Sequence, residues 1–403
     1  MPLAVYVIGL GVFSMTTSEF MVSGLMPALA EEFGVSIAAV GYLITAYAAA
    51  MTLGGPVLTV GLLRTSRKTA LLTLIGVFFL GQALGALSSG YGMMMAARVI
   101  TGVASAAFFG VGLATCAEMV GPRLRGRAVS VAIGGLMIGT VLGLPAATLI
   151  SQHFGWRASF WSVAVLVLLT GLVILRLLAA SPSPESVSVR AEVAALVNVR
   201  LWAVYATSML IIGATFAAFS YFVPILTDVS GFAPETVPLL LVAYGLATVV
   251  GNAIVGRLAD DHTLPVLAVG LIALTAALVI FAAFAEVPVL AVAALILIGL
   301  VGVTMNPAMA ARVMRVGNDG ALVNTVHSSV ITTGVVIGSW GGGLVISAGY
   351  GLTAPLWLGA GVAVLGLLSL LPELVQCDAG TGSGSQSASA SSGEERAACL
   401  DAS

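Results

Sequence analysis

Residues 11–30 read GVFSMTTSEFMVSGLMPALA, and Glu19 is the one charged side chain between Leu3 and Ala30. A largely apolar stretch of this length is long enough to cross a bilayer as a helix. A carboxylate near the hydrocarbon centre costs a few kcal/mol, so a chain that retains one usually turns it toward a cavity and uses it. We therefore interpret Glu19 as a proton or substrate site.

A purely structural interpretation of Glu19 is also open. Hydroxyl groups lie close to it in the sequence, on Thr16, Thr17 and Ser23. One of them would hold the carboxyl group in its neutral form by a hydrogen bond, and Glu19 would then have a structural role only.

Composition extends this interpretation from one span to the whole chain. Of 403 residues, 59% are hydrophobic and only 8% are charged, whereas a soluble surface needs about a quarter charged residues. This composition predicts an all-α polytopic membrane protein embedded in the lipid bilayer. The net charge of −2 gives no sign of a nucleic-acid partner.

Apolar runs between charged or Pro/Gly-rich breaks predict twelve transmembrane helices in two six-helix halves. We expect an N-terminal bundle at 1–180, a cytoplasmic linker at 181–200, a C-terminal bundle at 201–373 and a disordered cytoplasmic tail at 374–403. The spans themselves are expected near 3–30, 37–62, 69–88, 92–117, 128–150, 158–180, 201–226, 237–258, 264–285, 288–311, 321–347 and 353–372.

Basic residues predict the orientation. Lys and Arg fall in alternate connections and in the tail, while Arg157 alone falls on the opposite side and Arg98 lies inside the fourth span. By the positive-inside rule, both termini should be cytoplasmic.

An internal repeat supports the division into two halves. A shift of 197 residues aligns Pro27 with Pro224 and Tyr47 with Tyr244. At the same shift Glu19 meets Phe216 and Arg98 meets Leu295. The intramembrane charges thus belong to one half only, which is not expected of residues that serve a shared scaffold.

The loop GNAIVGRLADD at 251–261 resembles the signature loop of the major facilitator superfamily through Gly256, Arg257 and Asp260. The resemblance implies the major facilitator fold and a charge switch at helix ends that differs between two domain arrangements. The equivalent N-terminal loop has Leu63 where the repeat places Asp260. Ordinary helix-end charge is the alternative.

AARVITGVASAAFFG at 96–110 resembles the superfamily's Arg-x-x-x-Gly helix motif through Arg98 and Gly102. A cation there can hold a carboxylate ionised or release it, and Glu19 is the carboxylate at that depth. The alternative is that Arg98 extends to the outer interface and only anchors its helix.

The fifth span, GGLMIGTVLGLPAATLISQHF at 134–154, resembles the motif of drug:proton antiporters through Gly139, Gly143 and Pro145. Small residues permit close helix contact, and proline frees backbone groups locally. With TSEFMVSGLMPALA at 17–30, the resemblance points to a bacterial subgroup that includes chloramphenicol, sugar and nucleoside exporters. It implies a multi-pass protein of the bacterial inner membrane.

The sequence lacks the common motifs of nucleotide-hydrolysing enzymes, metalloproteases and serine hydrolases. The chain has no Walker A loop, no HExxH and no GxSxG, so we expect no enzyme, no catalytic residue, no cofactor and no metal. His327 lies in a predicted span, where it either faces the pore or packs.

We therefore expect a monomeric, proton-driven exporter of small amphipathic compounds, powered by the proton gradient, with Glu19 as proton carrier and Arg98 as its modulating cation. Its substrate is either an antibiotic such as chloramphenicol or a sugar or nucleoside. A receptor or scaffold that transports nothing is the alternative from another class. Aromatic residues suited to a substrate cavity, or equally to packing, are Phe13, Phe20, Tyr47, Phe108, Phe216 and Phe219.

Overall fold

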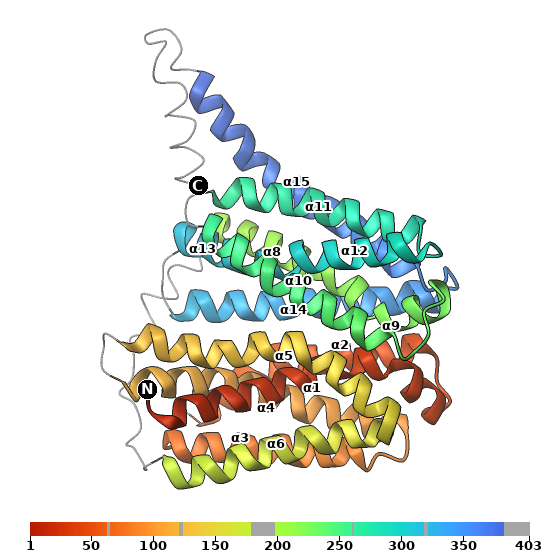
Figure 1. Ribbon diagram of the computed structural model, residues 1–403. Helices are drawn as coiled ribbons and strands as arrows, with labels where there is room; N and C mark the ends of the chain where they lie inside the picture. Colours follow the sequence, from red (N-terminus) through yellow and green to blue (C-terminus); the bar gives the residue numbers. More distant parts are fainter. Residues whose placement is uncertain (63–64, 121–123, 179–197, 260–261, 318–320, 383–403) are drawn as a thin grey trace. The chain divides into compact units, whose positions relative to one another are not determined.

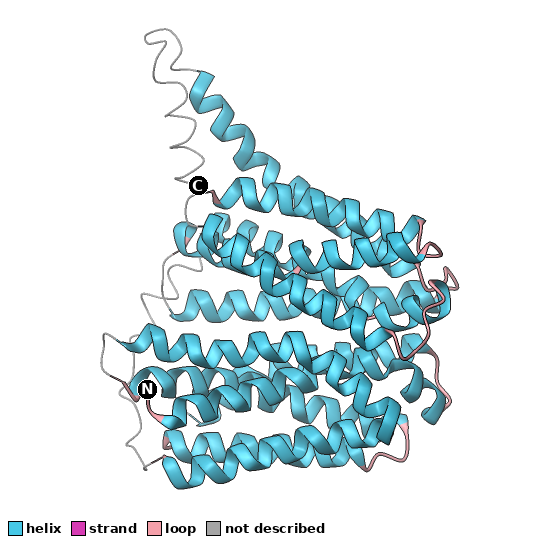
Figure 2. Ribbon diagram, viewed as in Figure 1, coloured by secondary structure: helices cyan, strands magenta, loops and turns pink. Residues whose placement is uncertain are grey.

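The computed structural model describes residues 1–62, 65–120, 124–178, 198–259, 262–317 and 321–382. Every regular element among these residues is helical, and Figure 2 shows no strand among them. Twelve of the described helical stretches are long and apolar enough to cross a membrane. The predicted all-α class and the predicted number of spans are thus confirmed.

The first six spans are unbroken helices that pack against one another (Figure 1, red to yellow). The central helix α1 packs against α5, α6, α2 and α4, while α3 packs against α4 and α6. The bounds are Leu3–Phe33 for α1, Ile37–Leu62 for α2, Arg67–Ala86 for α3, Tyr91–Glu118 for α4, Arg125–Phe154 for α5 and Trp156–Leu177 for α6.

Local sequence signals set several helix ends. Gly34 ends α1 in the left-handed conformation, with φ of 61°, and the next amide, of Val35, donates to the carbonyl of Ala30 at 3.0 Å. Ser66 caps α3, because its hydroxyl accepts from the amide of Thr69 at 3.2 Å. Gly155, with φ of 81°, makes the one-residue turn between α5 and α6.

The C-terminal half contains more and shorter elements. They are α8 Val199–Phe219, α9 Phe222–Pro224, the π-helix η2 Ile225–Val229, α10 Val237–Leu258, α11 Thr263–Ala283, α12 Pro288–Val301, the 3-10 helix η3 Val303–Met305, α13 Asn306–Val316, α14 Ala321–Ser347 and α15 Ala354–Gly382.

Two spans expected as continuous helices are interrupted, which corrects the prediction. The seventh breaks after Phe219 and continues through α9 and the π-helix, where Pro224 lacks the amide that would bond back into the preceding turn. The tenth breaks at Gly302, and Pro307 again removes a helical donor just beyond the break.

The chain forms two compact units. Unit 1 contains the described residues of 1–186, 219–245 and 342–352, and unit 2 those of 187–218, 246–341 and 353–403. Segments 219–245 and 342–352 therefore group with the first half, and the six-plus-six division stays a prediction. Residues 181–197 of the linker and 383–403 of the tail lie outside the described residues, while α15 continues to Gly382.

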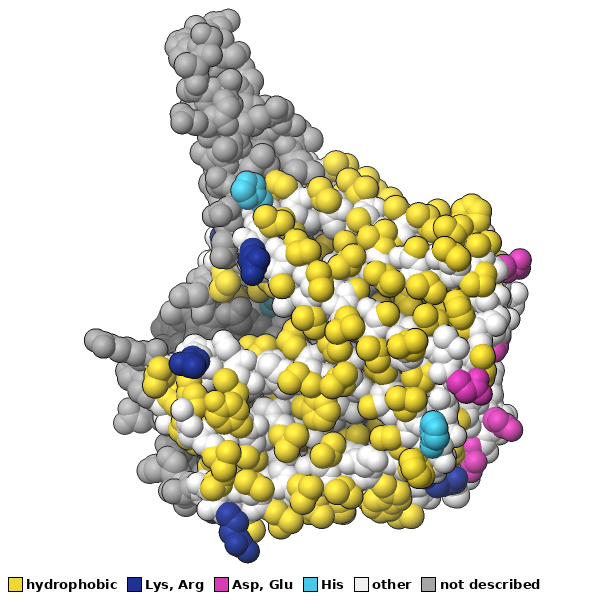
Figure 3. Space-filling model, viewed as in Figure 1, with side chains coloured by type: hydrophobic (Ala, Val, Ile, Leu, Met, Phe, Trp, Pro, Cys, Tyr) yellow, Lys and Arg dark blue, Asp and Glu magenta, His cyan; other side chains and the backbone are white. Residues whose placement is uncertain are grey.

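The helices present apolar side chains outward. Leu53 and Val57 are each 72% exposed and Val289 is 77% exposed. Figure 3 shows a face covered by hydrophobic side chains, with the visible charged groups toward helix ends. Such a surface suits lipid tails, as expected for a chain that crosses the bilayer many times.

Candidate functional site

Arg98 lies inside the helix bundle of unit 1. Its side chain on α4 is 1% exposed. The guanidinium donates through Nη1 to the backbone carbonyl of Ser18 at 2.8 Å, through Nη2 to that of Glu19 at 3.2 Å and through Nε to that of Leu43 at 3.4 Å. Arg98 thus ties α4 to α1 and α2 and does not extend to the outer interface.

Gly102, one turn beyond Arg98, explains how α2 comes so close. A Cβ atom at Gly102 would clash with the carbonyl oxygen of Tyr47, so any larger residue would push α2 away. The close approach places the Tyr47 ring 4.1 Å from the guanidinium carbon of Arg98, a cation–π contact. In the Arg-x-x-x-Gly motif, the glycine therefore lets α2 approach closely enough for Tyr47 to contact the buried Arg98 cation.

Glu19 is half-buried on α1, beside Arg98. No salt bridge joins the two side chains in the described structure, because the guanidinium contacts the Glu19 carbonyl and not its carboxylate. Because the Glu19 carbonyl that accepts from Arg98 belongs to the same residue as the carboxylate, the two opposite charges lie near each other and attract. The site thus holds a carboxyl group and a cation close together without locking them to each other.

Two of the three hydroxyls that would keep Glu19 neutral do not bond to it in the described structure. The Thr17 hydroxyl donates to the carbonyl of Phe13 at 2.9 Å, back along its own helix. The buried Ser23 hydroxyl has no hydrogen-bond partner within the described part of the chain. Neither hydroxyl therefore holds the Glu19 carboxyl group in this arrangement.

Two polar residues of this site are not predicted from the sequence. The amide of Gln82 on α3 donates from Nε2 to the Ser18 hydroxyl, and both side chains are 0% exposed. Ser18 Oγ also lies 3.4 Å from Nη1 of Arg98. An amide in an otherwise apolar span is the available signal, because buried amides in membranes form hydrogen bonds between helices.

Glycines on α5 set the position of α1, which carries Glu19. A Cβ atom at Gly139 would lie 2.9 Å from Cβ of Thr16, and one at Gly143 would lie 2.9 Å from Cα of Thr17. Gly135 continues the same stripe, since a Cβ there would clash with the carbonyl oxygen of Gly9. The spacing of four residues keeps these glycines on one face of α5.

We expect Gly143→Val to destabilise the protein, because the added side chain must separate α5 from α1. Overpacking of this kind costs about 1–3 kcal/mol. Gly134→Val is the matched control, since nothing lies within 4 Å of a Cβ at Gly134 on the same helix. Thermal unfolding in detergent should show a lower midpoint for Gly143→Val only. Equal midpoints for the two variants would contradict this role of the stripe.

The predicted cavity aromatics do not form one group. Phe20 contacts Phe219 edge to face, with ring centroids 5.4 Å apart, and Phe219 also contacts Phe222 and Tyr244. Phe108 is fully buried, with its ring against Gly11 in the first-half bundle. Phe13 is half-buried on α1, Tyr47 lies under Arg98, and Phe216 belongs to unit 2.

The predicted switch loop is described only in part. Arg257 is exposed in the last turn of α10, and nothing lies within 4 Å of a Cβ at Gly256. Asp260 lies outside the described residues. In the first half, Arg67 donates to Glu118 through both Nε and Nη2, the latter at 2.6 Å, so a charge pair joins the ends of α3 and α4.

One cavity of about 230 Å³ lies in unit 1 between α1, α5 and the segment 223–237. Gln152 donates from Nε2 to the carbonyl of Pro234 at 2.6 Å beside it, and Thr227 donates to Asp228 at 2.7 Å. The hydrogen bond of Gln152 thus joins the C-terminal end of α5 to the segment after α8. The positive-inside pattern predicts that this end of α5 faces outward.

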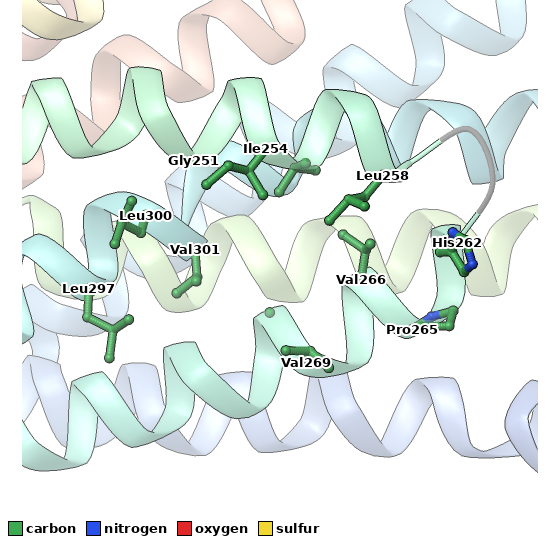
Figure 4. Close-up of a pocket in the computed structure, with 12 residues that line it drawn as sticks. Gly251, Ile254, Leu258, His262, Pro265, Val266, Val269, Leu297, Leu300 and Val301 are labelled. Carbon is green, nitrogen blue, oxygen red and sulfur yellow. The ribbon is translucent and has the colours of Figure 1, made fainter.

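A second cavity, in unit 2, is apolar. It is an open pocket of about 520 Å³ between α10, α11 and α12 (Figure 4). Its lining includes Ile254, Leu258 and Val269, and His262 lies at one end. No Asp, Glu, Lys or Arg of the described residues lines it. It therefore offers surface to an apolar molecule but no group for proton exchange by a carboxylate.

His327 in unit 2 packs against its neighbours. Its Nε2 lies 3.1 Å from the Ser208 hydroxyl, and its ring stacks on Tyr205 with centroids 5.8 Å apart. Among the described residues, no three His, Cys, Asp or Glu side chains are grouped so that they could hold a metal ion.

Known proteins resemble this chain over most of its length. A chloramphenicol resistance protein of Streptomyces lividans is 32% identical over 381 residues, which cover 92% of this chain and 96% of that protein. The inner membrane transport protein YdhP of Escherichia coli K12 is 32% identical over 362 residues, covering 90% and 93%. The crystal structure of the human organic anion transporter MFSD10 (TETRAN) matches with a TM-score of 0.67 at 15% identity, over 91% of this chain and 98% of that chain.

The family profile agrees with these relatives and with the twelve-span fold. The profile described as Major Facilitator Superfamily matches residues 8–320, which include Glu19, Arg98 and the glycine stripe of α5. This chain therefore belongs to the Major Facilitator Superfamily and is a multi-pass membrane transporter.

Proposed function

We propose that this transporter is a proton-coupled exporter of small amphipathic compounds, with chloramphenicol or a similar neutral antibiotic as substrate. The observation that carries the proposal is the arrangement of Glu19 and Arg98. A half-buried carboxylate lies inside the membrane beside a cation that is held by carbonyl groups and not by the carboxylate itself. Such a carboxylate is free to gain and lose a proton during each cycle.

The positions of these groups support proton coupling. When Glu19 is ionised, the positive charge of Arg98 stabilises it; when Glu19 is protonated, Arg98 keeps its bonds to the carbonyls of Ser18 and Glu19. Proton binding thereby changes the electrostatic energy of the α1–α4 contact. A change of this kind can shift the equilibrium between two arrangements of the transporter.

The substrate class is supported by charge and by the Streptomyces relative. In the first six spans, Glu19 and Arg98 are the two charged residues that lie away from the helix ends, which leaves little to neutralise a highly charged substrate. The aromatic contacts around Phe219 suit a partly apolar ligand. The relative named for chloramphenicol resistance supports a phenicol as the first compound to test.

We further propose that the protein works as a monomer in the bacterial inner membrane, with both termini in the cytoplasm. The alternation of Lys and Arg among the connections supports this orientation.

We expect expression in a sensitive bacterial host to raise chloramphenicol resistance and to lower accumulation of the labelled drug several-fold. Accumulation should return to the level of cells without the transporter when an uncoupler collapses the proton gradient. Unchanged chloramphenicol accumulation, together with proton-driven export of a sugar or nucleoside, would replace the substrate and keep the transport mechanism. Absence of any proton-driven export would overturn the proposal.

A further inference from the structure

Gln82 is a buried amide without a role in the coupling of Glu19 to Arg98 proposed for this transporter. It lies on α3 in unit 1, is 0% exposed, and donates from Nε2 to the Ser18 hydroxyl. Its Oε1 atom has no hydrogen-bond partner within the described residues. Leaving a buried acceptor unpaired costs about 1–3 kcal/mol, so an amide at this position calls for an explanation.

Ser18 connects Gln82 to Arg98 and Glu19. Its hydroxyl oxygen accepts from Gln82 and lies 3.4 Å from Nη1 of Arg98, while its backbone carbonyl accepts from the same nitrogen at 2.8 Å. Ser18 also directly precedes Glu19 on α1. A change in the hydrogen bonds of the Ser18 hydroxyl therefore affects both Arg98 and Glu19.

Arg98 is only loosely held at the hydroxyl. A guanidinium has five N–H donors, and Arg98 makes four bonds to described residues, two of them long at 3.4 Å. Because the Gln82 amide occupies a lone pair of the Ser18 hydroxyl, that oxygen is a poorer acceptor for Arg98. Part of the donor capacity of Arg98 is thereby left for the ionised carboxylate of Glu19.

We propose that Gln82 is a positioning residue for proton coupling, which acts through Ser18 to keep the Arg98 guanidinium available to Glu19. This inference rests on the proposed function, because it assigns Gln82 a role in the protonation of Glu19. It adds a third helix, α3, to a site otherwise built from α1, α2 and α4.

The test is Gln82→Leu, which keeps a similar volume and removes the amide. The Ser18 hydroxyl then becomes a full acceptor for Arg98, so Arg98 supports ionised Glu19 less well and Glu19 stays protonated at lower proton concentrations. Purified protein is labelled with dicyclohexylcarbodiimide, which reacts with protonated carboxyl groups, and modification of the Glu19 peptide is followed by mass spectrometry from pH 5 to about pH 9. We expect the midpoint to lie at a proton concentration about tenfold lower, which corresponds to about 1.4 kcal/mol less stabilisation of the ionised carboxylate by the Arg98 charge.

A double-mutant comparison separates positioning from general packing. In a Ser18→Ala background the route from Gln82 to Arg98 is absent, so adding Gln82→Leu should leave the midpoint unchanged. Size-exclusion chromatography confirms that each variant is folded. An unchanged midpoint in the single Gln82→Leu variant, or an equal shift in both backgrounds, would overturn the inference.

Failure of the inference about Gln82 can be distinguished from failure of the proposed export function. The labelling midpoint needs no transported substrate, whereas the proposed function is judged by uncoupler-sensitive export and its loss in Glu19→Gln. Normal export with an unshifted Gln82→Leu midpoint rejects the role of Gln82 alone. A shifted midpoint without any proton-driven export would reject the proposed export function and support the link from Gln82 through Ser18 to Arg98.

Discussion

Glu19→Gln should abolish proton-coupled export and leave the folded protein in the membrane. The glutamine amide has nearly the shape of the carboxyl group but cannot exchange a proton in the pH range of a cellular gradient. Because Glu19 is half-buried and its carboxylate is not locked to Arg98, the substitution removes the titrating group without breaking a salt bridge. We expect the uncoupler-sensitive export rate to fall to background.

The measurement is uptake of labelled chloramphenicol into inverted vesicles with an imposed pH gradient, normalised to transporter content. Glu31→Gln is the matched control, since Glu31 carries the same group on the same helix but is exposed near its end. The control should transport like the wild type. Wild-type, uncoupler-sensitive uptake by Glu19→Gln would show that another group carries the proton.

Arg98→Ala should reduce transport by at least about tenfold, because hydrogen bonds to a charged group contribute about 1.5–3 kcal/mol. Alanine removes the donors that bond the carbonyls of Ser18, Glu19 and Leu43, and also the charge that acts on the Glu19 carboxylate. Arg98→Lys should lose less, because it keeps the cation but lacks the planar fork that reaches several carbonyls.

The two Arg98 variants are compared in the same vesicle assay at equal transporter content. Arg176→Ala is the control, since Arg176 is exposed in the last turn of α6. We expect the order wild type and Arg176→Ala, then Arg98→Lys, then Arg98→Ala. Near-normal transport by Arg98→Ala would show that Arg98 only holds the helices together and has no part in coupling.

Hydropathy and charge by themselves determine the class of this protein and its number of spans. Transfer into lipid is unfavourable for charged side chains and unpaired backbone groups, so apolar stretches about twenty residues long must be helices and their number can be counted directly. The same energetics identify Glu19 and Arg98, because charged residues inside such stretches are costly. The spacing of Gly139 and Gly143 likewise predicts a close helix contact, and the structure places it between α5 and α1.

The internal repeat does not predict the local geometry of its two copies. Pro27 and Pro224 are equivalent in the repeat, yet α1 continues through Pro27 while the seventh span becomes a π-helix directly after Pro224. A proline removes the same donor in both places. The missing donor therefore does not decide by itself which of the two copies keeps a regular helix.

The hydrogen bonds of the site are decided by tertiary structure alone. The sequence predicts that Arg98 acts on Glu19, but the carbonyl partners of the guanidinium and the link from Gln82 through Ser18 depend on how four helices are rotated about their axes. Hydropathy is a local property of each span and hardly depends on that rotation. Rotation is set by packing between residues far apart in the chain, such as Gly102 against Tyr47, and therefore only the folded protein shows which polar groups meet.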